Sequence, residues 1–338
     1  MGFYLLANFF SALSNTFAKY LTHNGFFPSG TRVLDIFLHA NLINLLLFFA
    51  IYFFKKRRNE IHFSIKETFF RKDEFKQVLL FAIPILAASY KLFMMDFMKI
   101  SDIEISAMIK PFCVWFLAII FLGEKFYPFY IKYALIAVLG FLIANKNILP
   151  FDIFPYTIDF DNWTILYSGY QHSNAHYDSK TLFFLISYIC FASIGDVTRR
   201  YYCRKCAETM QAVCVEIVMF AFYGLIILTI RGTFSINLLF HPCSLLISLI
   251  TLSHHFCIIH GVQKAPTVTA LEFINFSKIV FVLILSYCLL GTKIYNNKIL
   301  GALIIAITLI LFNFRIRKES NNIKKTILSK NVCFNSKI

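Results

Sequence analysis

The sequence has 338 residues, of which 58% are hydrophobic and 15% are charged, and its mean hydropathy is +0.67. Soluble domains carry about a quarter charged residues, so the composition excludes a soluble globular protein and predicts a polytopic helical membrane protein. The net charge of +15 does not indicate nucleic-acid binding, because the basic residues lie in loops and in the C-terminal tail, where membrane topology places them.

Ten apolar segments have the length of about 20 residues that crosses a hydrocarbon layer of ~30 Å. We predict membrane-spanning helices at residues 3–22, 34–54, 77–98, 103–122, 128–145, 181–198, 210–230, 242–262, 267–290 and 298–314. The predicted fold class is therefore all-α, with ten transmembrane helices.

Two segments of the chain repeat one another. Residues 101–145 align with residues 269–313 at a constant offset of 168 positions, without a gap. The matched pairs include Glu104 and Glu272, Lys110 and Lys278, Leu122-Gly123 and Leu290-Gly291, Lys125 and Lys293, Tyr127 and Tyr295, and Asn145 and Asn313. Two copies of a helical unit are typical of a transporter built from internal repeats.

The distribution of Lys and Arg predicts that both termini are cytoplasmic. With that orientation the inward loops and the tail hold 22 basic residues, and the outward loops hold 7. Each half has five spans, an odd number, so the second half enters the membrane inverted. We expect a first repeat at residues 1–146, a polar outward loop at 147–179, a second repeat at 180–315 and a basic cytoplasmic tail at 316–338.

The fourth span carries a resemblance to a known family. Ala107 and Pro111, followed by Phe121-Leu122-Gly123-Glu124-Lys125, resemble the fourth-span signature of EamA-type transporters of the drug/metabolite transporter superfamily. The second copy repeats the turn as Leu289-Leu290-Gly291-Thr292-Lys293, with Thr292 in place of the usual acidic residue and no counterpart of Pro111. The resemblance covers residues 3 to 314. It implies two inverted five-helix repeats around a central cavity and transport by alternating access, and it does not fix the substrate.

Lys110 and Lys278 are the leading substrate-binding candidates. A lysine at the centre of a span costs about 2.5–3.5 kcal/mol on insertion scales, so we expect neither to face lipid. Inverted repeats would place both at the same depth, where they could clamp a carboxylate or a phosphate. The alternative is that each lysine pairs with an intramembrane acid, such as Asp96, Glu216 or Glu272, and only holds helices together.

Several other polar residues lie within or beside the spans. Tyr90, Lys91 and Asn275 are further candidates for substrate binding, although Lys91 could instead extend outward towards Asp96. Candidates for coupling or charge compensation are Glu216, Glu272, His254 and His255. For the histidines, packing with a bond to a neighbouring carbonyl is the alternative. Asp196 precedes Arg199 and Arg200 by helical spacings, which favours an interfacial ion pair.

The sequence gives no motif for a metal or a cofactor. Most of the nine cysteines lie inside apolar spans, unlike those of a disulfide scaffold. Cys203 and Cys206 form a CxxC, but no second pair or nearby histidine completes a zinc site. We therefore expect neither a metal nor a cofactor.

The leading hypothesis is a secondary transporter, not an enzyme, that moves a small metabolite with an anionic group across a bacterial inner membrane by alternating access. Its expected partners are the metabolite and the lipid bilayer; a coupling proton or ion and a homodimer are left open, and no nucleic acid is expected. One alternative is a membrane-embedded transferase, although His172 and His176 beside the acids of the 147–179 loop form no recognisable catalytic motif. The other is an organellar translocator of nucleotide sugars or phosphate esters.

Overall fold

The computed structural model describes the chain in segments. These are residues 2–28, 30–70, 82–96, 98–100, 103–104, 107–123, 129–144, 156–159, 164–167, 179–206, 208–265, 271, 274–291, 299–308, 310–312, 314–315 and 318. Structural statements below concern these residues.

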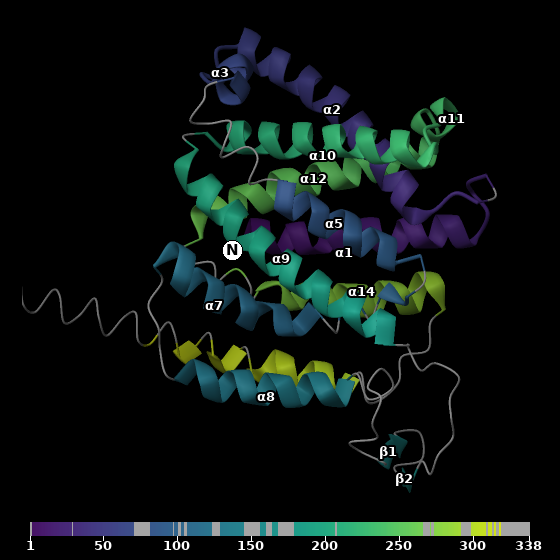
Figure 1. Ribbon diagram of the computed structural model, residues 1–338, viewed down its shortest axis with the longest axis vertical. Helices are drawn as coiled ribbons and strands as arrows, with labels where there is room; N and C mark the ends of the chain where they lie inside the picture. The colour runs from purple at the N-terminus through teal and green to yellow at the C-terminus, as the bar shows by residue number, and fades with distance from the viewer. Residues whose placement is uncertain are drawn as a thin grey trace, which may run out of the picture.

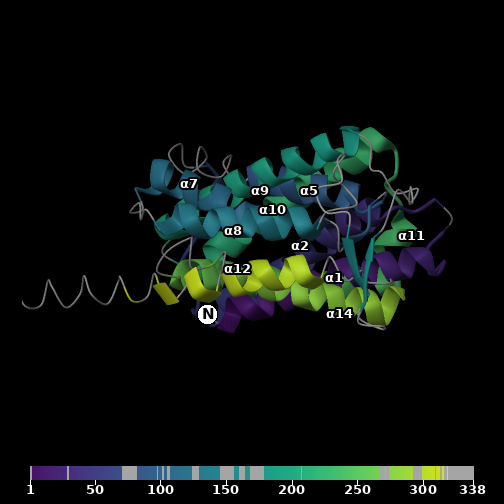
Figure 2. The ribbon, with the colours of Figure 1, turned by 90° about the horizontal axis from the view of Figure 1, so that it is seen from below.

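The fold is helical. In chain order the helices are α1 (Gly2–His23), α2 (Val33–Arg57), α3 (Ile65–Phe70), α5 (Ala82–Met94), the 3₁₀ turn η1 (Ala107–Ile109), α7 (Lys110–Leu122), α8 (Phe129–Ala144), α9 (Ser179–Lys205), α10 (Thr209–Arg231), α11 (Ile236–Leu239), α12 (Pro242–Lys264) and α14 (Phe276–Leu290). A final helix covers residues 299–312. The long helices run roughly parallel or antiparallel to one another in a layered bundle (Figures 1 and 2).

Among the described residues, a short hairpin departs from the helical fold. Strands β1 (Tyr156–Asp159) and β2 (Thr164–Tyr167) pair antiparallel, with Tyr156 opposite Tyr167 and Asp159 opposite Thr164. Both lie in the loop that the sequence predicted as polar. Outside this loop the described elements are helices, so the all-helical fold class is confirmed for the bundle.

Three described helices are long and apolar enough to cross a membrane: α2, α10 and α12. Shorter apolar helices are Ala82–Met94, Lys110–Leu122, Ser277–Leu290 and Ile299–Phe312. Large apolar side chains also cover much of the surface; Phe53 is 64% exposed and Ile230 is 81% exposed. Extensive apolar surface of this kind indicates contact with lipid or another apolar partner. The helices therefore indicate association with a membrane, as the composition predicts.

Two long helices, α1 and α9, are central to the packing. α1 contacts α12 and α14, whereas α9 contacts α5 and α7. α2 packs against α10 and α12. In Figure 1, α1, α5, α9 and α12 occupy the middle of the bundle, and α8 lies at one end of its long axis beside the yellow C-terminal helix. The central helices thus bring both halves of the chain together in one interior.

The helices that carry Lys110 and Lys278 begin close to those lysines. The sequence predicted an uninterrupted span over 103–122, but among the described residues η1 separates Glu104 from α7, which begins at Lys110. Pro111 explains the break, because proline has no N–H for the preceding turn and is favoured in the first turn of a helix. Similarly, α14 begins at Phe276, two residues before Lys278.

Both helices end on a left-handed glycine. Gly123 after α7 has φ 63°, and its N–H bonds to the Ala118 carbonyl. Gly291 after α14 has φ 59°, and its N–H bonds to the Ser286 carbonyl. Glycine adopts this conformation without the steric cost that a Cβ imposes, which explains its presence at both ends.

Candidate functional site

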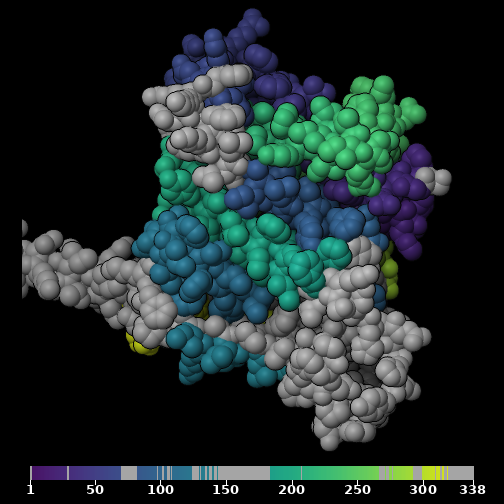
Figure 3. Space-filling model, viewed as in Figure 1, coloured from purple at the N-terminus to yellow at the C-terminus, as the bar shows by residue number. Residues whose placement is uncertain are grey.

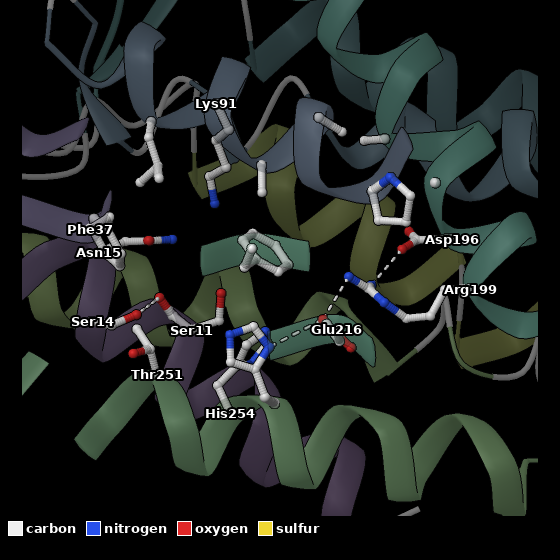
Figure 4. Close-up of a pocket in the computed structure, with 18 of the residues that line it drawn as sticks. Ser11, Ser14, Asn15, Phe37, Lys91, Asp196, Arg199, Glu216, Thr251 and His254 are labelled. Carbon is white, nitrogen blue, oxygen red and sulfur yellow. Dashed lines mark hydrogen bonds and ion pairs between the residues drawn. The ribbon is translucent and has the colours of Figure 1, made fainter. Parts of the chain in front are cut away.

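A cavity of about 170 Å³ lies inside the bundle. It is lined from α1, α2, α5, α7, α9, α10, α12 and α14. The lining residues are Ser11, Ser14, Asn15, Phe37, Asn41, Pro84, Ala87, Ala88, Lys91, Leu92, Lys110, Tyr188, Ala192, Gly195, Asp196, Arg199, Glu216, Phe220, Thr251, His254, His255 and Lys278. Figure 4 shows labelled side chains from several helices pointing into this space. The space-filling view in Figure 3 shows one outer face of the molecule.

One group of charges in the site is the Glu104 triad, formed by Lys91, Glu104 and Lys278. Lys91 Nζ donates to Glu104 Oε1, and Lys278 Nζ lies 3.3 Å from the same oxygen. The side chains of Lys91 and Glu104 are 8% and 5% exposed. Both lysines line the cavity. Because two ammonium groups share one carboxylate, the triad has a net charge of +1.

The other group is the Asp196 chain, which runs through Lys110, Asp196, Arg199, Glu216 and His255. Lys110 Nζ donates to Asp196 Oδ2, and Arg199 Nη1 lies 3.2 Å from Asp196 Oδ1. Arg199 Nη2 also lies 3.2 Å from Glu216 Oε1. The same oxygen is 3.1 Å from His255 Nδ1. The chain therefore links α7, α9, α10 and α12 through ionic hydrogen bonds (Figure 4).

Two buried atoms of the Asp196 chain have further hydrogen-bonding capacity. Glu216 Oε2 and Arg199 Nε make no hydrogen bond within the described segments. A buried polar atom without a hydrogen-bond partner lowers the stability of the fold by roughly 1–3 kcal/mol. Such an atom therefore calls for an explanation, and binding of a ligand or a proton is one. Glu216 thus has one oxygen engaged and one open.

The opposite side of the cavity carries several neutral polar groups. In Figure 4, Ser11, Ser14, Asn15 and Phe37 lie across the cavity from Asp196 and Arg199. Asn41 of α2 and Thr251 of α12 add an amide and a hydroxyl to the lining. Lys91 also points into the cavity on this side, so neutral hydrogen-bonding groups lie here beside one ammonium group, across from Asp196 and Arg199.

Lys110 and Lys278 both line the cavity, but they belong to different charge groups. Within the described residues, Asp196 contacts Lys110 and Glu104 contacts Lys278. Of the acids that the sequence suggested as partners, Asp96, Glu216 and Glu272, the last lies outside the described residues. Glu104 reaches lysines on other helices, in keeping with the six-residue spacing that disfavoured an ion pair with Lys110. Asp96 instead accepts a hydrogen bond from the Val33 N–H at 3.2 Å, at the start of α2.

The other predicted residues divide into those in the cavity and those outside its described lining. Lys91, Glu216, His254 and His255 line it. His254 Nδ1 is 2.8 Å from the Ala7 carbonyl oxygen, as expected for a packed histidine.

Tyr90 and Asn275 are not among the described lining residues. The Tyr90 ring packs against Phe184 and Phe191, and Asn275 is the residue that precedes α14. Glu272 lies outside the described residues.

Arg199 and the two asparagines of the cavity were not predicted. The sequence placed Arg199 and Arg200 in a loop after residue 198, but α9 continues to Lys205, so both lie in a helix, where Arg200 is buried and Arg199 is partly buried. Arg200 donates to the carbonyls of Val262 and Ala265. The helical spacing of Asp196 and Arg199 was a usable signal for this continuation. Asn15 and Asn41 had no comparable signal, because single amides occur in many helices.

No family model and no curated protein matches this sequence. Among solved structures, one described only as "Crystal structure of protein" is similar to this chain with a TM-score of 0.60. The match covers 93% of this chain and 98% of the other, at 10% sequence identity. The similarity therefore extends over the whole bundle and concerns the fold alone.

Proposed function

We propose that this protein is a secondary transporter of a small metabolite with an anionic group, working by alternating access in a bacterial inner membrane. The observation that carries the proposal is the cavity, where Lys91, Lys110, Arg199 and Lys278 meet inside an apolar helical bundle. Charged residues within membrane helices are costly and generally mark substrate or ion pathways. Both halves of the chain supply these four cations, as expected for a site between repeats.

The helix packing supports inverted repeats as part of this proposal. With the offset of 168 residues, α7 corresponds to α14, and the matching order of helices pairs α1 with α9 and α5 with α12. α1 contacts α12 and α14, whereas α9 contacts their counterparts α5 and α7. The first helix of each half thus packs against the third and fourth long helices of the other half. Such reciprocal packing is expected of two repeats related by a pseudo-two-fold axis. We further propose that the protein has ten membrane-spanning helices with both termini in the cytoplasm. We also propose that it belongs to the EamA-type transporters.

The Glu104 triad is the proposed binding site for the anionic group. An ammonium group has three donor hydrogens, so Lys91 and Lys278 can each hold Glu104 and still donate into the cavity. The excess positive charge of the triad would be neutralised by a carboxylate or phosphate. Lys110 is more strongly committed to Asp196, so we assign it a supporting role instead of the clamp with Lys278 suggested by the sequence.

The open oxygen of Glu216 supports a coupling role. Glu216 is buried, and its Oε2 is available to a proton or a cation while Oε1 holds Arg199 and His255. A proton on Glu216 would weaken its ion pair with Arg199, and this would alter the contact between α9 and α10. Glu216 and His255 are accordingly the proposed coupling residues, with His254 beside them.

The test is uptake into proteoliposomes after a screen for anionic metabolites that raise the melting temperature of the purified protein. A stabilising compound should be taken up by the wild type. Lys278→Met and Lys91→Met should each reduce uptake by at least about tenfold, because each removes a charge-assisted contact to the substrate. Lys264→Met, at an exposed helix end, is the matched control and should transport normally. Normal uptake by both cavity variants would contradict the proposal.

A further inference from the structure

Two buried amides in the cavity have no protein partner in the described segments. The Asn15 side chain in α1 and the Asn41 side chain in α2 form no hydrogen bond there, although these residues are only 7% and 6% exposed. Both line the cavity, and Figure 4 shows the Asn15 amide pointing into it. Each therefore presents a carbonyl oxygen and an NH₂ group to whatever occupies the cavity.

Two neighbouring asparagines on the same helices behave differently. Asn8 Nδ2 donates to the Ile274 carbonyl at 2.7 Å and to Ser277 Oγ at 3.2 Å. Asn44 donates to Thr251 Oγ1 at 2.8 Å and accepts from Ser248 Oγ at 2.6 Å. These two amides join helices. Because the bundle engages the amides of Asn8 and Asn44 in bonds between helices, the open amides of Asn15 and Asn41 indicate a binding role.

The chemistry around Asn15 suggests an uncharged ligand group. The labelled neighbours on its side of the cavity in Figure 4 are the hydroxyls of Ser11 and Ser14, the ring of Phe37 and the end of Lys91. The ammonium group of Lys91 is already held by Glu104. Phe37 and Asn41 are four residues apart on α2, so they lie on one face of that helix. Amides both donate and accept hydrogen bonds, and a hydroxyl or a carboxamide does the same. Neither group brings a charge that would need a counter-ion there.

We propose that the cavity selects an organic monoanion that also carries a neutral hydroxyl or carboxamide group. This inference rests on the proposed function, because it places the anionic end of the ligand at Lys91 and Lys278. The neutral end binds Asn15 and Asn41. One excess positive charge in the Glu104 triad matches one negative charge on the ligand. A cavity of about 170 Å³ is small for a ligand pocket, which favours a short ligand.

The test uses five four-carbon compounds and the purified full-length chain. Butanoate has the anionic end only, whereas 4-hydroxybutanoate and succinamate add a hydroxyl and a carboxamide. Succinate adds a second carboxylate, and 4-aminobutanoate adds an ammonium group. Affinities are obtained from the dependence of the melting temperature on ligand concentration. We expect 4-hydroxybutanoate and succinamate to bind about tenfold more tightly than the other three.

Three variants assign that preference to the amides. Asn41→Leu and Asn15→Leu keep the side-chain size and remove hydrogen bonding, so each should lower the affinity for succinamate about tenfold and leave that for butanoate unchanged. Two variants are used so that the test can still be made if one of them fails to fold. Asn24→Leu, at an exposed amide outside the cavity, should match the wild type.

The outcomes separate this inference from the proposed function. If all five compounds bind equally and Lys278→Met abolishes binding, the anion site stands and the selection by amides is wrong. Preference for succinate or 4-aminobutanoate, or a preference that survives in both leucine variants, would also overturn the inference. If none of the compounds binds to the wild type, the inference is overturned whatever the metabolite screen finds. Uptake that does not depend on the lysines contradicts the proposed function itself.

Discussion

Lys91 and Lys278 meet at a single carboxylate oxygen of Glu104, although they lie in opposite halves of the chain. This shared oxygen joins α5, α14 and the segment before η1 deep in the bundle. A buried carboxylate between two ammonium groups stabilises both of them. The triad therefore links the stability of the fold to the charge of the cavity.

Glu104→Gln should strongly destabilise the protein. The change leaves the buried Lys91 and the partly buried Lys278 without their carboxylate, and removing one partner of a buried ion pair typically costs about 3–5 kcal/mol. We expect a lower melting temperature in detergent. Glu60→Gln, at an exposed position, is the control and should leave the melting temperature unchanged. Adding Lys91→Met to Glu104→Gln should restore part of the loss, and a double variant less stable than Glu104→Gln would argue against the triad.

Lys110 and Asp196 should show a coupling energy in a double-mutant cycle. Their side chains are partly buried and form an ionic hydrogen bond between α7 and α9. We expect Lys110→Met and Asp196→Asn to be non-additive by about 1–3 kcal/mol in the free energy of unfolding. Additive effects within about 0.5 kcal/mol would show that the two residues do not stabilise one another.

Gly195→Ala should destabilise the contact between α9 and α5. A Cβ at Gly195 would come within 2.9 Å of Pro84 Cα, and backbone atoms cannot move aside as a flexible side chain can. Overpacking of this kind typically costs about 1–3 kcal/mol. Gly224→Ala is the matched control, because its Cβ would meet Leu38 Cδ2 at 3.4 Å. Equal melting temperatures for the two variants would contradict this packing.

Gly123→Ala and Gly291→Ala should destabilise the protein by similar amounts. Both positions have positive φ at the end of a helix, and a Cβ there costs roughly 1–2 kcal/mol. Chemical unfolding of each variant measures the loss. Gly2→Ala, in a site with no neighbour within 4 Å and without positive φ, should have little effect. Effects that differ by more than about 1 kcal/mol would show that the two turns are not equivalent.

The sequence predicted apolar helices where the described residues have α2, α10 and α12, because hydropathy reports the preference of a segment for lipid. The count of ten spans stays a prediction. The sequence also predicted that Lys110 and Lys278 lie inside the bundle, and both line the cavity. It did not predict that α9 continues to Lys205. Basic residues usually mark the edge of a membrane, so Arg199 and Arg200 were assigned to a loop. Their charges are tolerated because Asp196, Glu216 and the carbonyls of neighbouring helices neutralise or bind them.

The composition of the site depends on three-dimensional proximity. Asp196 was expected to pair with Arg199, three residues away, and it does, because helical spacing is visible in sequence. Its contact with Lys110 joins two distant segments, and no local pattern encodes such a contact. The open amides of Asn15 and Asn41 are likewise distinguished from Asn8 and Asn44 only by what surrounds them.

Access to the cavity from each side of the membrane tests alternating access most directly. Ser11→Cys, on the cavity lining, is introduced into a variant without native cysteines, and a membrane-impermeant thiol reagent is applied to either face of oriented vesicles. Ser244→Cys, fully buried and outside the described lining, is the control. The account predicts that Ser11→Cys reacts from both faces and is protected by a transported anion. Reaction from one face only, or from neither, would contradict it.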